Sequence, residues 1–83
     1  MGMNMSTVER YEGYIIEPSP NQLRDGGWDH ELYVLRHGAS GLAQKKFSTD
    51  AVFKTKREAV AACIAFGMEV IDGMVAKCAV ENL

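Results

Sequence analysis

The chain has 83 residues and a mass of 9.2 kDa, which is enough for one domain, because domains usually need on the order of 100 residues. Hydrophobic residues make up 47% of the sequence and charged residues 24%, proportions that exclude a wholly disordered or fibrous chain. Nine basic and eleven acidic residues give a net charge of −2, which disfavours a dedicated binder of nucleic acid or of anionic membranes.

The sequence carries no recognisable targeting segment. No stretch approaches the ~20 apolar residues that a membrane-spanning helix needs. Residues 1–7 lack the basic and apolar regions of a signal peptide and show no periodicity, so we expect a flexible tail. Residues 8–83 are expected to form a single domain in the cytoplasm, with no membrane contact.

The first predicted strand covers residues 8–17. It is rich in aromatic and β-branched side chains and is stopped by Pro18 and Pro20. Gly13, in the middle of this stretch, indicates a bulge or a close backbone approach. A turn at Asp25-Gly26-Gly27 precedes the next strand.

The second and third strands follow as a hairpin. The second is predicted over residues 28–37, and the glycine-bracketed loop 37–41 has hairpin length. The third is predicted over residues 42–48, with a break at residues 48–50. Residues 51–53 are expected to form a brief extended stretch before a helix.

The helix is predicted over residues 56–72. Thr55 and Glu58 have the spacing of a capping box, in which the Thr55 hydroxyl accepts from the Glu58 amide. Apolar residues then recur at helical spacing, and Gly73 can adopt the left-handed conformation that ends a helix.

The order of elements predicts an α+β fold, a three-stranded antiparallel meander with one C-terminal helix packed across one face (β-β-β-α). Gly67 within the helix costs about 1 kcal/mol relative to alanine. Its presence indicates that the helix approaches a bulky sheet residue such as Trp28 or Tyr14.

Strand alternation predicts that the second strand has two apolar faces. Leu32 and Val34 share one face, and Tyr33 and Leu35 share the other. A single helix can cover only one of them. We therefore expect a homodimer through the uncovered face, or alternatively a cover supplied by segment 74–83 of the same chain.

The cysteines and histidines do not suggest a metal site. Cys63 and Cys78 lack the close spacing of zinc ligands, and reduced thiols are expected, with a disulfide as the alternative if the chain after Cys63 folds back. His30 and His37 lie seven residues apart and so have opposite strand orientations. We expect both to be exposed, and no cofactor is expected.

The charge is uneven along the chain. Residues 42–58 carry five basic residues against two acidic ones, net +3. These basic side chains can contact phosphates, or Lys45 and Lys46 can protect an edge strand from pairing. Together with the two apolar residues of the second strand they make up the candidate binding surface: Tyr33, Leu35, Lys45, Lys46, Lys54, Lys56 and Arg57.

Several short motifs are spread along the chain: Tyr11-Glu12-Gly13-Tyr14, Pro18-Ser19-Pro20, Arg36-His37-Gly38, Phe47-Ser48, Phe53 to Ala59 and Ile71-Asp72-Gly73. Over about residues 8–83 they resemble a family of small bacterial proteins, which implies a sheet-plus-helix domain, no known activity and no catalytic residues. The helix entry Phe53, Thr55, Glu58 and Ala59 is more distantly similar to plant AP2-type and integrase N-terminal DNA-binding domains, which also run β-β-β-α.

No nucleophile stands beside a base in a recognisable setting, because Ser19, Ser40 and Ser48 lie in turn-like contexts. The sequence therefore predicts a non-enzymatic module that binds an unknown protein partner or associates with itself. The alternative is a nucleic-acid-associated protein that uses the sheet face and the basic strip from Lys45 to Arg57. An enzyme with a site at a subunit interface is a third, weaker alternative.

Overall fold

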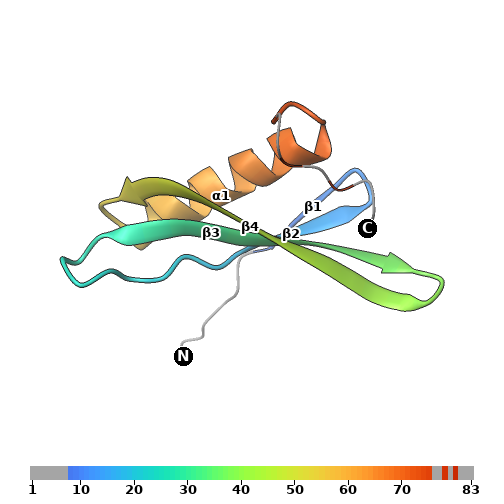
Figure 1. Cartoon of the computed structure of the whole chain (residues 1–83), viewed down its shortest axis with the longest axis horizontal. Helices are drawn as coiled ribbons and strands as arrows, with labels where there is room; N and C mark the ends of the chain where they lie inside the picture. The colour runs from blue at the N-terminus through green and yellow to red at the C-terminus, as the bar shows by residue number, and fades with distance from the viewer. Residues whose placement is uncertain (1–7, 76–77, 79, 81–83) are drawn as a thin grey trace.

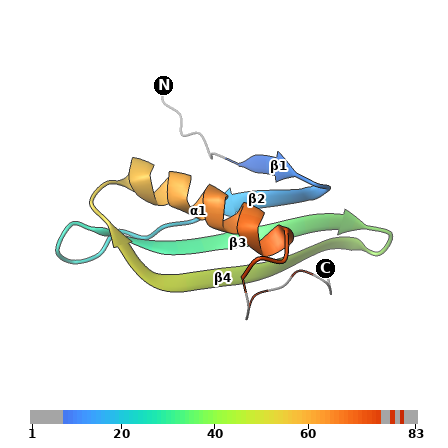
Figure 2. The same cartoon turned by 90° about the horizontal axis from the view of Figure 1, so that it is seen from above.

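The computed structural model describes residues 8–75, 78 and 80. In this part of the chain the elements are β1 (Glu9–Tyr11), β2 (Tyr14–Pro18), β3 (Trp28–Gly38), β4 (Gly41–Phe53) and α1 (Lys56–Ile71). The strands form an antiparallel sheet in the order β1-β2-β3-β4, and α1 lies on one side of it (Figures 1 and 2). The α+β class, the antiparallel sheet and the C-terminal helix are confirmed. The prediction of three strands is wrong, and the predicted tail 1–7 lies outside the described residues.

The extra strand arises because the first predicted strand is a hairpin. Glu12 and Gly13 both have positive φ, +52° and +86°, and Tyr11 pairs directly with Tyr14 across them. Positive φ at both central residues is what a two-residue type I′ hairpin turn requires. Gly13 is therefore a turn residue and not a bulge within one strand.

The third predicted strand continues through its expected break. Thr49 pairs with His30, and Phe53 pairs with Trp28. Between these two pairs β4 has three residues, whereas β3 has only one. This irregularity is a bulge, which bends the bulged strand. The Ala51 amide donates to Thr49 Oγ1 at 3.1 Å, so a side chain satisfies a backbone group there.

The helix begins and ends close to the predicted positions. Thr55 is extended, with φ −129° and ψ 155°, and its Oγ1 accepts from the Glu58 amide at 3.1 Å. Asp72 is the C-cap, and Gly73 follows with φ +76°. The predicted cap at Thr55 is thereby confirmed. No helix in the described part of the chain is long and apolar enough to cross a membrane.

The core lies between α1 and the sheet, with α1 mainly over β2 and β3 (Figure 2). A Cβ added at Gly67 would lie 2.7 Å from Ile16 Cγ2, and Ile16 is fully buried. The bulky neighbour of Gly67 is thus Ile16 and not Trp28 or Tyr14. The buried apolar side chains of this core come from three strands, the helix and the C-terminal segment: Ile16, Leu32, Val34, Phe47, Ala59, Cys63, Val70 and Val80.

The C-terminal segment contributes to this core on the helix side. Val80 is 7% exposed and belongs to the core cluster, and Val75 and Cys78 pack against it. The predicted alternative, in which segment 74–83 covers the other sheet face, is not what these residues do. Residues 76–77, 79 and 81–83 lie outside the described part of the chain.

Candidate functional site

The side of the sheet away from α1 carries an apolar patch, which we call the open face and define by Ile15, Tyr33, Leu35 and Leu42. Ile15 of β2 pairs with Leu35 of β3, and Tyr33 lies two residues along on the same side. The alternate β3 residues are buried under α1, so the predicted division into two apolar faces is confirmed. Ile15, Tyr33 and Leu35 are half-buried, and Leu42 is 55% exposed.

Sequence reasoning found Tyr33 and Leu35 but missed Ile15 and Leu42. These two residues belong to the patch only because of strand pairing: Ile15 lies beside Leu35, and Leu42 lies beside His37. The sequence shows how side chains alternate along each strand, but it does not show which residues of the next strand lie beside Ile15 and Leu42. That depends on the strand register.

Carboxylates are concentrated at one end of this side of the sheet. Asp29 and Glu31 lie there on β3, beyond the row of Tyr33. Glu17 and Lys46 both pair with Tyr33, and Arg10 lies in the adjacent row. The face therefore has an acidic end, and charges of both signs lie near its centre.

The acidic end is held by side-chain contacts. The backbone amide of Asn21 donates to Asp29 Oδ1 at 2.7 Å, and the side-chain Nδ2 of Asn21 donates to Asp29 Oδ2 at 3.2 Å. Lys46 Nζ lies 3.7 Å from Glu31 Oε2. These contacts orient the carboxylates without neutralising the whole cluster, because three carboxylates face one lysine.

The predicted basic strip does not form one surface. Lys45 pairs with Val34, which is buried under α1, whereas Lys46 pairs with Tyr33, so the two lysines lie on opposite faces of β4. Lys45 Nζ lies 5.7 Å from the Phe47 ring centroid.

The remaining basic residues lie where β4 passes into α1. Lys56 Nζ is 5.7 Å from the Trp28 ring centroid, and Lys54 and Arg57 are exposed. The structure therefore separates these three from Lys46 and from the open face.

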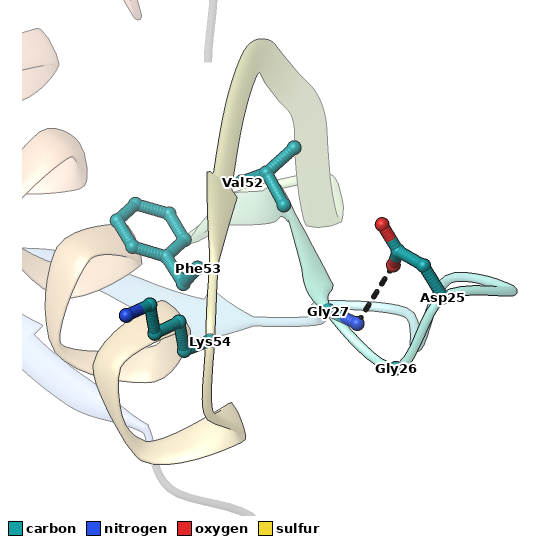
Figure 3. Close-up of a pocket in the computed structure, with 6 residues that line it drawn as sticks. All are labelled: Asp25, Gly26, Gly27, Val52, Phe53 and Lys54. Atoms are coloured by element: carbon teal, nitrogen blue, oxygen red, sulfur yellow. Dashed lines mark hydrogen bonds between the residues drawn. The ribbon is translucent and has the colours of Figure 1, made fainter.

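A shallow hollow of about 340 Å³ lies between the 25–27 turn and the end of β4 (Figure 3). Its one carboxylate, Asp25, accepts from the Gly27 amide at 2.9 Å and so stabilises the turn. In Figure 3 the Asp25 carboxylate points toward Gly27, and the Lys54 ammonium points away from it. This hollow does not bring polar groups together on a ligand.

A second hollow, of about 410 Å³, lies at the β1–β2 hairpin and the end of β3. Arg10, Glu12, Ile15 and His37 are among the residues that line it, so both a guanidinium and a carboxylate lie at this hollow.

His30 is buried, so the prediction that it is exposed is wrong, whereas His37 is exposed as predicted. His30 Nδ1 lies 2.6 Å from Thr49 Oγ1, and its ring packs edge-on against Phe53 and Phe66 at centroid distances of 5.5 and 5.2 Å. Its Nε2 has no hydrogen-bond partner among the described residues. The imidazole is thus part of the packing between β3 and α1.

Cys63 and Cys78 are both free thiols. Cys63 is fully buried, and its Sγ donates to the Glu31 carbonyl oxygen at 3.3 Å. Burial raises the pKa of the Cys63 thiol, which keeps it protonated and unreactive. Among residues 8–75, 78 and 80, no three His, Cys, Asp or Glu side chains come together as metal ligands.

Comparisons with protein-family models, with curated proteins and with solved structures found no match. The resemblances to a family of small bacterial proteins and to DNA-binding domains therefore stay predictions. What the geometry does place together is an apolar patch on one side of a thin sheet, with two carboxylates, Asp29 and Glu31, at one end of it.

Proposed function

We propose that this chain is a non-enzymatic protein-interaction module that associates with itself through the open face. The observation that supports it is the position of Ile15, Tyr33 and Leu35. These residues lie side by side on the two central strands, and no other described element packs over them. Contiguous apolar patches of this kind usually mark an interaction surface.

The size of the protein supports self-association. A domain of this length buries only about 60% of the surface of its unfolded chain, so a single core is thin. A second copy on the open face adds a third and fourth layer and removes apolar surface from water. Two-fold symmetry is the commonest way to achieve this.

The same geometry gives less support to the alternative that the chain binds nucleic acid. Glu17, Asp29 and Glu31 lie on the side of the sheet that would face a phosphate backbone, and they would repel it. Lys45 lies on the opposite side of the sheet.

The molar mass tests the proposal. Light scattering from micromolar to high micromolar concentration should show the mass rising from 9.2 kDa toward twice that value. Tyr33→Thr and Leu35→Thr keep strand propensity but remove apolar area, so both should weaken the dimer. Val52→Thr is the matched control, because Val52 is exposed on β4 beside the 25–27 turn, outside the open face.

A mass of 9.2 kDa at every concentration would contradict self-association. NMR titration with duplex DNA and with RNA at physiological salt tests the alternative that the chain binds nucleic acid. Specific chemical-shift changes along β4 and the start of α1 would then favour the nucleic-acid function.

A further inference from the structure

We draw no further inference here: the strongest candidate, the open face on the side of the sheet away from α1, is already the surface of the proposed self-association, and nothing in the described part of the chain shows how a second copy would lie on it.

Discussion

Two residues set the distance between α1 and the sheet. Gly67 and Ile16 face each other in the core, where the branched side chain of Ile16 fills the space that a Cβ at position 67 would need. Glycine is ordinarily unfavourable within a helix, so here close packing outweighs helix propensity.

Gly67→Ala should therefore destabilise the protein, by roughly 1–2 kcal/mol, although alanine is the better helix former. The added Cβ would meet Ile16 Cγ2 at 2.7 Å, and a fully buried β-branched side chain has little room to move. Urea unfolding measures the change. In an Ile16→Ala background the same substitution should become neutral or stabilising, because the clash is gone. If Gly67→Ala alone were more stable than the wild type, the close packing against Ile16 would not be the reason for the glycine.

The two cysteines should differ in reactivity. Cys63 is fully buried with a raised pKa, whereas Cys78 is half-buried. In the native state a thiol reagent should modify Cys78 about tenfold faster or more. The single variants Cys63→Ala and Cys78→Ala assign each rate, and equal fast rates would contradict the burial of Cys63. Absence of labelling under denaturing conditions would indicate a disulfide instead of free thiols.

At the scale of elements, α1 is tied at both ends by side-chain hydrogen bonds. Thr55 caps its first turn. At its other end, Tyr11 Oη of β1 donates to Asp72 Oδ2 at 2.8 Å and to Oδ1 at 3.0 Å. The short β1 strand is thus joined to the helix end as well as to β2.

Thr55→Ala should lower the free energy of unfolding by about 1 kcal/mol, because the Glu58 amide loses its acceptor. Thr55→Ser keeps a hydroxyl in the same place and should retain most of the stability. Denaturant midpoints of the three proteins give the comparison. An unchanged midpoint with an unchanged m-value in Thr55→Ala would rule out the capping role.

The bond from Tyr11 predicts a dependence on alkaline pH. The hydrogen bond to Asp72, followed by partial burial and the negative charges of Asp72 and Glu12, raises the pKa of Tyr11 above its usual value of about 10. The folded state therefore holds this proton more tightly than the unfolded state. The stabilisation is fully present below the unfolded pKa and is lost as the pH rises through the folded pKa.

Tyr11→Phe should accordingly be less stable than the wild type near neutral pH. The difference should shrink as the pH rises above about 10, because the wild type loses the contribution of Tyr11. Urea midpoints across this range measure it, and parallel pH profiles for the two proteins would contradict the role of the bond. Asp72→Asn keeps an acceptor but removes the charge, so phenolate absorbance should then show a lower pKa for Tyr11.

At the scale of the whole molecule, the described chain is a slab of two layers. Its principal extents are 41 × 35 × 17 Å, and the short dimension is that of a sheet with one helix on it. The helix covers the centre of one face (Figure 2). Val80 belongs to the core cluster on that face. The other face has no second layer among the described residues, which is the reason for proposing a second copy there.

Val80→Ala should cost about 2 kcal/mol, the contribution expected of a buried valine whose removal also leaves a small cavity. The effect would show that the C-terminal segment belongs to the helix-side core. Val8→Ala is a control of the same size at a position that is 48% exposed. Equal small effects of the two substitutions would contradict the placement of Val80.

Much of the fold was predictable where the information is local. The capping chemistry of Thr55 and the helical spacing after it lie within one segment, so α1 was predicted to within a residue. The alternation of β3 likewise predicted which side chains, Tyr33 and Leu35, face away from the helix. About half of the open face followed from that alternation alone.

What the tertiary structure decided depends on partners distant in sequence. Glu12 adopts positive φ because Tyr11 and Tyr14 pair across it, and no local preference of glutamate indicates this. His30 is buried because Phe66 of α1 packs on it from 36 positions further along the chain.

The candidate surface divides in the same way. The sequence by itself determined that one apolar face of β3 must remain outside a single-helix core, because side chains alternate and one helix covers one face. Only the strand register decided which residues of β1, β2 and β4 stand beside it, and hence that Arg10 and Glu17 lie in adjacent rows on that side of the sheet. Pairing between strands depends on contacts along their whole length, and no single strand carries that information.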